Sequence, residues 1–132
     1  MKILITGSRW ISISEELINQ YLVLMNWQHA DIIYEYNEGV GYYVQQYIKS
    51  FNMKGSTYVE QDEYYKHLGM YSVRRFKYMM DDGIDGVLLF WDGKEKKFSV
   101  LKKLLDNDQI PLIEVNLPRN LSPWADKLKF IT

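Results

Sequence analysis

Short apolar runs that alternate with longer amphipathic segments are the feature that most constrains the fold of this chain. The clearest run, residues 87–90, reads Val-Leu-Leu-Phe without a polar interruption, and another opens the chain at residues 2–6. Continuous apolar runs are typical of parallel strands that are covered on both faces. Strands that alternate with helices indicate βαβ units with right-handed crossovers. The sequence therefore predicts an α/β fold, a Rossmann-like three-layer sandwich with a mostly parallel five-stranded sheet.

The expected elements follow from this alternation. Strands are predicted at residues 2–6, 31–36, 56–60, 86–91 and 111–115, and helices from residue 12 and at 42–51, 72–82 and 96–107. Ser12 and Glu15 have the spacing of a capping box that would open the first helix. Residues 61–71 and the C-terminal tail, 116–132, show no clear period, so both are expected to be irregular.

Length and composition narrow the class of protein. The 132 residues favour one domain, residues 1–132, and the absence of cysteine excludes disulfides and thiolate–metal sites. His29 and His67 lack a zinc-ligand spacing, so no metal site and no cofactor are expected. No segment approaches about 18 uninterrupted apolar residues, which argues against a membrane partner and favours a cytoplasmic location. A net charge of −1 argues against nucleic acid as a partner.

Candidate binding residues collect in three loops. In open parallel sheets, ligands bind outside the carboxyl ends of the strands. The loops after the first, second and fourth predicted strands include residues 7–11, 37–42 and 91–97. They are therefore expected to meet at one edge of the sheet and to form a ligand site there.

The first loop, Gly7-Ser8-Arg9-Trp10, offers groups suited to a phosphate. Glycine lets backbone N–H groups approach an anion closely, and the N-terminus of a following helix is electropositive. Ser8 can donate a hydroxyl hydrogen bond, and Arg9 can make a bidentate contact. Gly-Ser after a strand is also ordinary turn chemistry, so both interpretations stay open.

The second loop and a later helix add acids and cations. Gly39 and Gly41 provide another flexible backbone surface, and Glu38 can accept hydrogen bonds from ribose hydroxyls or remain a solvated carboxylate. Arg74 and Arg75 begin a helix, where cations oppose the macrodipole. Helix stability does not explain their placement, so one of them is expected to meet a ligand or a carboxylate.

Aromatic rings and further cations complete the candidate site. Three rings at this edge suit stacking on a base: Trp10, Tyr42 and Trp91. The loop after the fourth strand turns at an Asp-Gly pair and then carries cations: Asp92, Gly93, Lys94 and Lys97. The 11 tyrosines and 4 tryptophans also suit a protein interface, so a homodimer is expected.

Two motifs in this order resemble the SLOG superfamily. Residues 5–10 read Ile-Thr-Gly-Ser-Arg-Trp, and residues 90–94 read Phe-Trp-Asp-Gly-Lys. The nearest branch is the YpsA-related group of small bacterial and phage proteins, and the resemblance ends near residue 116. It implies a Rossmann-like fold that binds nucleotides or nucleotide-derived molecules. By this resemblance Gly7, Ser8 and Arg9 match the family's first loop, and Arg75 matches its helical arginine.

The chain departs from this family where related proteins carry a Gly-Thr pair that holds phosphate. Lys97 and Phe98 occupy those positions. We therefore expect Phe98 to turn inward and Lys94 or Lys97 to take over the phosphate contact. The glutamate that LOG enzymes carry just after the pair has no clear equivalent, which argues against catalysis.

Three functions are consistent with these features. The first is non-catalytic binding of a nucleotide, ADP-ribose or a cyclic nucleotide, which the resemblance connects to sensing or sequestering a signal in conflict between phage and host. The second is hydrolysis of an N-glycosidic bond, as by a nucleoside monophosphate phosphoribohydrolase, with Glu38 stabilising the transition state. The third is a protein-interaction module whose pocket has decayed.

Overall fold

The strands form one parallel sheet in the order β3-β2-β1-β4-β5. The computed structural model describes residues 1–57 and 71–120, and the side chains of residues 1–55 and 76–120. Four strands have four to six residues, and the edge strand β3 has three: β1 Lys2–Gly7, β2 Asp31–Tyr34, β3 Gly55–Thr57, β4 Gly86–Trp91 and β5 Leu112–Asn116. The predicted α/β class and the parallel sheet are confirmed.

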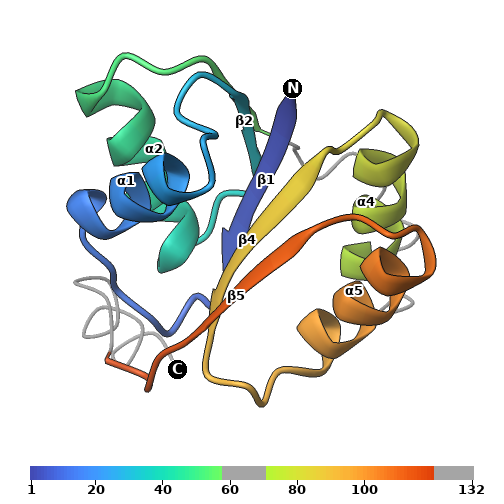
Figure 1. The fold of residues 1–132 in the computed structure, drawn as a ribbon. Coiled ribbons are helices and arrows are strands. Elements are labelled where there is room, and N and C mark those ends of the chain that lie inside the picture. The colour runs from blue at the N-terminus through green and yellow to red at the C-terminus, as the bar shows by residue number, and fades with distance from the viewer. Residues whose placement is uncertain (58–70, 121–132) are drawn as a thin grey trace.

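Helices cover both faces of the sheet, as the sequence predicts (Figure 1). On one face lie α1, Glu15–Leu24, and α2, Val40–Ser50; on the other lie α4, Tyr71–Asp81, and α5, Lys96–Asn107. From β1 the chain first adds strands on one side and then returns to add β4 and β5 on the other. This reversal between β1 and β4 is the position at which Rossmann-like folds bind ligands.

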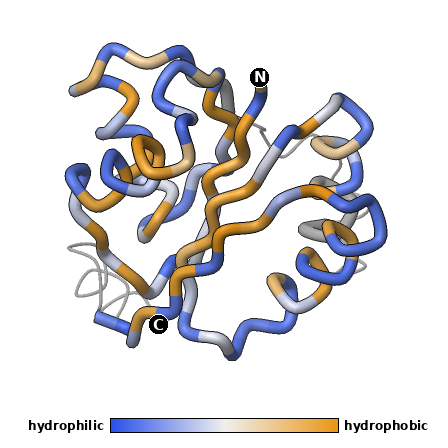
Figure 2. The backbone as a smooth tube through the Cα atoms, in the orientation of Figure 1, coloured by the Kyte–Doolittle hydropathy of each residue, from blue (hydrophilic) through white to orange (hydrophobic). Residues whose placement is uncertain are grey.

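Two apolar layers hold the sandwich together. Ile3 and Ile5 of β1 pack under α1 and α2, whereas Leu4 points to the opposite layer under α4 and α5. In β4, Phe90 and Leu89 alternate in the same way. Figure 2 shows the resulting stripe of hydrophobic residues along the central strands. Side chains of a strand alternate between its two faces, so each central strand contributes to both layers.

The ends of the elements follow local chemistry. The predicted limits of β4 and α5 are confirmed at both ends. The predicted capping box is wrong, because α1 begins at Glu15 and its N-cap is Ser14, whose Oγ accepts a hydrogen bond from Leu17 N at 3.1 Å. The strand β2 ends at Tyr34, two residues earlier than predicted.

Several predicted segments lie partly outside the described residues. These are the end of the predicted third strand, residues 58–60, the segment 61–70, and the tail from residue 121. Within the predicted tail, Asn116 ends β5, and residues 117–120 form neither helix nor strand. In the described parts of the chain, every helix is too short or too polar to cross a membrane.

Replacing Ser14 tests the observed start of α1. We expect Ser14→Ala to lower the free energy of unfolding by about 1 kcal/mol, because Leu17 N–H loses its side-chain acceptor. Urea denaturation measures the change. Ser99→Ala, at an exposed position inside α5, is the matched control and should be neutral or slightly stabilising. Equal effects of the two substitutions would contradict Ser14 as the cap.

Candidate functional site

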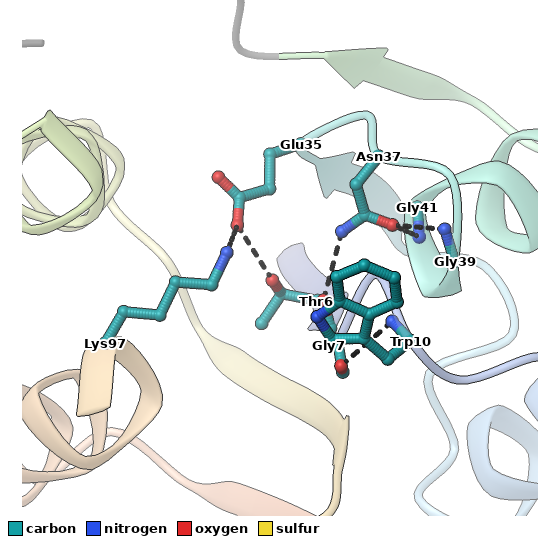
Figure 3. A network of polar contacts seen from close by, with 9 residues as sticks. Thr6, Gly7, Trp10, Glu35, Asn37, Gly39, Gly41 and Lys97 are labelled. Atoms are coloured by element: carbon teal, nitrogen blue, oxygen red, sulfur yellow. Dashed lines mark hydrogen bonds and ion pairs between the residues drawn. The ribbon is translucent and has the colours of Figure 1, made fainter. Parts of the chain in front are cut away.

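A buried carboxylate lies at the carboxyl edge of the sheet. Glu35 directly follows β2 and is only 3% exposed. Thr6 Oγ1 donates a hydrogen bond to Glu35 Oε1 at 3.4 Å, and Lys97 Nζ lies 3.7 Å from the same oxygen (Figure 3). The cluster thus joins the end of β1, the end of β2 and the first turn of α5. A buried carboxylate needs such partners because desolvation of an isolated charge is costly.

Strand alternation explains why the side chains of Thr6 and Glu35 point to the same face of the sheet. Leu4 and Ile33 belong to the apolar layer under α4 and α5. Thr6 and Glu35 follow them by two residues, so they continue the same face of the sheet beyond its apolar part. Lys97 was expected at this edge and is found there, whereas sequence reasoning missed Glu35. The signal was a charged residue at the end of a strand expected to be buried.

A second polar centre surrounds Asn37, which sequence reasoning also missed. Its Oδ1 accepts hydrogen bonds from Gly39 N at 2.8 Å and Gly41 N at 2.9 Å, and its Nδ2 donates to Gly7 O at 3.0 Å (Figure 3). Val40 N donates to the carbonyl oxygen at position 8, at 3.1 Å. The first N–H groups of α2 are therefore bonded within the protein rather than presented to an anion.

The three glycines of this edge serve backbone packing. A Cβ atom on Gly7 would lie 2.2 Å from Phe90 O, and one on Gly39 would lie 2.3 Å from the carbonyl oxygen of residue 8. A Cβ atom on Gly41 would lie 2.4 Å from Glu35 O. The sequence predicted a close approach to a ligand at these positions. The structure instead places the protein's own backbone against each of them.

Ser8 is likewise used inside the protein. The residue is fully buried, its Oγ accepts a hydrogen bond from Trp10 N at 3.0 Å, and its own N–H donates to Phe90 O at 3.0 Å. The predicted contacts of this backbone N–H and hydroxyl to phosphate are therefore wrong, because both groups are buried and bonded within the protein. The serine shapes the turn that leads to Arg9 and Trp10, because its hydroxyl oxygen accepts the hydrogen bond of the Trp10 backbone N–H.

Arg9 extends over the edge of the sheet, as its place in the turn predicts. Its Nη2 lies 3.3 Å from Glu38 Oε2, and the two side chains are 43% and 35% exposed. The Arg9 guanidinium carbon also lies 5.0 Å from the centre of the Trp10 ring. Glu38 is therefore an ion-pair partner of Arg9, where the sequence left it as an acceptor for ribose or a solvated carboxylate.

The segment after β5 fastens these loops to one another. Asn120 Nδ2 donates to Ser12 O at 2.8 Å, Asn120 Oδ1 accepts from Ser12 N, and Asn120 N donates to Trp10 O at 3.3 Å. Arg119 Nε donates to Asp92 Oδ2 at 2.8 Å. The segment 117–120 thereby connects the loop after β1 with the loop after β4. Sequence reasoning missed Arg119 and Asn120, because nothing local in the sequence indicates contacts over such separations.

Asp92 is the anchor of the loop after β4. Its Oδ1 accepts from Lys94 N at 3.0 Å, and Gly93 between them has a φ of +83°, which favours glycine. The hydrogen bond from Arg119, together with the bond from Lys94 and the charges of both residues, lowers the pKa of the Asp92 carboxyl despite its burial. The predicted Asp-Gly turn is confirmed, and Lys94 is exposed beside it.

Trp91 is not placed to stack on a base. It is 3% exposed, and its Nε1 donates to Glu114 Oε2 at 2.6 Å. Lys102 Nζ lies 5.6 Å from its ring centre and pairs with Glu114 at 3.1 Å. The prediction for Trp91 is wrong, because the last side chain of β4 alternates into the layer under α5. Phe98 is fully buried in the same layer, as expected.

One further candidate, Arg75, and the two histidines differ in how far the structure describes them. Arg75 lies in α4, but its side chain falls outside the described part of the structure. His67 lies outside the described residues. His29 is exposed, five residues after α1 ends. Within the described ranges, no group of three or more histidine and carboxylate residues is placed to hold a metal ion.

Comparisons with protein-family models and with curated proteins gave no match for this chain. The resemblance to the SLOG superfamily therefore stays a prediction from the sequence. The charged side chains that gather at the carboxyl edge include Glu35, Lys97, Arg9 and Arg119.

Replacing Asn37 tests the closed backbone at the start of α2. We expect Asn37→Ala to destabilise the fold by about 1–3 kcal/mol, because two N–H groups of the turn lose their acceptor. Chemical denaturation gives the free energy, and Gln20→Ala on the exposed side of α1 is the control. An Asn37→Ala protein as stable as the control would show that solvent replaces this acceptor without cost.

Asp92 should make stability depend on pH in acid. Its pKa is lower in the folded protein than in the unfolded chain, so its contribution is present above the unfolded pKa and is lost as pH falls through the folded pKa. Asp92→Asn should therefore lower the melting temperature at pH 7. The difference from the original protein should shrink below about pH 4. Thermal melts across pH measure this, and a pH-independent difference would exclude the ionised carboxylate as its cause.

Proposed function

We propose that the chain binds a small phosphorylated ligand of the nucleotide class at the carboxyl edge of its sheet, beside Glu35 and Lys97. The observation that carries this proposal is a buried carboxylate paired with a half-buried lysine where the strand order reverses. Stability alone does not require this pair, since replacing a buried ion pair by well-packed apolar residues is often neutral or stabilising. A functional reason for retaining both charges is therefore favoured.

Lys97 is the proposed phosphate contact. It lies in the first turn of α5, where its positive charge opposes the helix dipole but where an anion is stabilised. Its side chain is 33% exposed, so Nζ is accessible from the edge while it remains near Glu35. The residue thus replaces, with a side-chain charge, the backbone contact that a Gly-Thr pair would make.

Glu35 is the proposed contact to sugar hydroxyls. A carboxylate at the end of the second strand is where Rossmann-like folds accept hydrogen bonds from ribose. Glu38 is a candidate for this role from the sequence, but it is paired with Arg9 on the exposed side of the loop. Glu35 is better placed because it lies at the edge itself, held by Thr6 and Lys97.

Binding without turnover remains the favoured version of this function. Sensing or sequestering of such a ligand, membership of the SLOG superfamily, a homodimer and a cytoplasmic location stay predictions of the sequence. Hydrolysis of an N-glycosidic bond is the second candidate, and Glu35 is its observed support, because a buried carboxylate can stabilise an oxocarbenium-like transition state.

Isothermal titration with AMP, CMP, ADP-ribose and cyclic AMP tests the proposal. We expect at least one of them to bind, and Lys97→Ala to weaken that binding by about 10- to 150-fold, as for a lost charge-assisted hydrogen bond. Lys103→Ala, exposed on the same helix away from its first turn, should leave affinity unchanged. Absence of binding by the whole panel, or equal affinities in both variants, would overturn it.

The same incubations distinguish binding from catalysis. Chromatography of AMP, CMP and dCMP after exposure to the protein detects free base. Release of base that disappears in Glu35→Gln would assign hydrolysis to this carboxylate. Intact nucleotide in the presence of measurable binding would support a binding protein.

A further inference from the structure

We infer that Arg9 and Arg119, which both lie over the ring of Trp10, form a second phosphate subsite, so that the ligand carries a second phosphoryl group. The inference rests on the proposed function, because the first phosphoryl group is the one assigned to Lys97. The second group is either adjacent to the first, as in a nucleoside diphosphate, or on another sugar position, as in a nucleoside bisphosphate.

The two guanidinium groups are brought together by one indole. The Arg9 guanidinium carbon lies 5.0 Å from the Trp10 ring centre and that of Arg119 lies 6.0 Å from it. The two carbons are therefore separated by no more than the sum of these distances. Cation–π contacts also orient the planar groups, which reduces the entropy lost when they bind a ligand.

Each of the two arginines beside Trp10 has a carboxylate partner among the described residues. Arg9 pairs with Glu38 and Arg119 pairs with Asp92, each through one contact. Lys94, whose charge also lowers the pKa of Asp92, adds a third cation to these two carboxylates. The Arg9 and Arg119 side chains are 43% and 51% exposed, so an anion in solvent has access to both.

Holding the segment 117–120 in place does not require a second arginine beside Arg9. Asn120 already fastens this segment to the backbone of Trp10 and Ser12 through three hydrogen bonds. Two like charges near one ring cost electrostatic energy, which a bound anion would reduce. The planar fork of arginine matches two phosphate oxygens better than lysine does, and this favours a phosphoryl group as the anion.

Both subsites lie near the end of β1. Figure 3 shows Trp10 and Lys97 on opposite sides of Thr6 and Gly7, at the end of β1. Arg9, in the loop after β1, pairs with Glu38 of the loop after β2. Arg119, which follows β5, lies over the Trp10 ring. A ligand that crosses the end of β1 would place one phosphoryl group near Lys97 and the other near the two arginines.

Titration with three adenosine nucleotides tests this inference: AMP, ADP and adenosine 3′,5′-bisphosphate. We expect ADP or the bisphosphate to bind at least about tenfold more tightly than AMP. Arg9→Ala and Arg119→Ala should each remove most of that advantage and change AMP affinity by less than about threefold. Lys49→Ala, at the opposite end of α2, is the control. The preferred probe identifies whether the two groups are adjacent or separated.

Stability measurements separate a binding role from a structural one. Melting of Arg9→Ala without ligand should stay close to that of the control, since exposed ion pairs contribute little. Arg119→Ala should melt lower, because the Asp92 side chain, only 6% exposed, loses its partner. If Arg119→Ala melts much lower, Arg119→Lys is the variant to titrate, because it keeps the charge but lacks the planar fork of arginine. Loss of the preference for a second phosphoryl group in Arg119→Lys supports the subsite, and full retention overturns it.

The remaining outcomes distinguish this inference from the proposed function. Equal affinities for all three nucleotides, sensitive to Lys97→Ala but to neither arginine variant, overturn the second subsite and leave the proposed function in place. If no nucleotide binds, inorganic pyrophosphate is the probe. Binding that depends on both arginines then supports the anion subsite alone, and absence of pyrophosphate binding overturns both.

Discussion

The close contact between the turn after β1 and the start of α2 is the constraint on which the rest of this edge depends. Gly39 lies so near the carbonyl oxygen of Ser8 that a side chain on it would collide with that oxygen. The same approach allows Val40 N–H to bond to this oxygen and brings Asn37 against Gly7 O. Glycine is required here because two main chains meet without space for a Cβ atom.

This contact determines where a ligand has access. It closes the glycine turn after β1, and it uses the first N–H groups of α2 within the protein. Polar groups for a ligand must then come from side chains at either side of the closed turn. Lys97 and Glu35 lie on the side of α5, whereas Arg9 and Arg119 lie around Trp10. The two-sided arrangement of the proposed site thus follows from how the backbones pack.

Local patterns predicted the fold better than the site. The limits of α5 and β4 follow from uninterrupted apolar spacing and a local Asp-Gly turn, so the sequence alone was sufficient for them. The same reasoning placed Trp91 at the edge as a stacking ring, although strand alternation buries it against Glu114. Sequence spacing indicates that a residue ends a strand, but the strand's register and twist decide which layer it enters.

The missed site residues share a different cause. Arg119 and Asn120 act on residues more than twenty positions away, through contacts with Asp92 and Ser12. Asn37 lies in the predicted loop 37–42, yet its amide group bonds to three backbone groups at once. Such roles depend on which loops the topology brings together. They become predictable only once the strand order is known, because that order decides which loops are neighbours.

The pairing of Glu35 with Lys97 also limits the chemistry of the proposed ligand. A bare phosphate that drew Lys97 away would leave the buried carboxylate with less compensation for its charge, and such a loss is costly at low exposure. A ligand that supplies hydroxyl donors to Glu35 as well as phosphate oxygens to Lys97 satisfies both partners in one step. Sugar phosphates and nucleotides carry these two groups a few bonds apart. The electrostatics of the cluster therefore favour a nucleotide over an inorganic anion at Lys97, because the sugar hydroxyls can donate to Glu35 while the phosphate oxygens, a few bonds away, accept from Lys97.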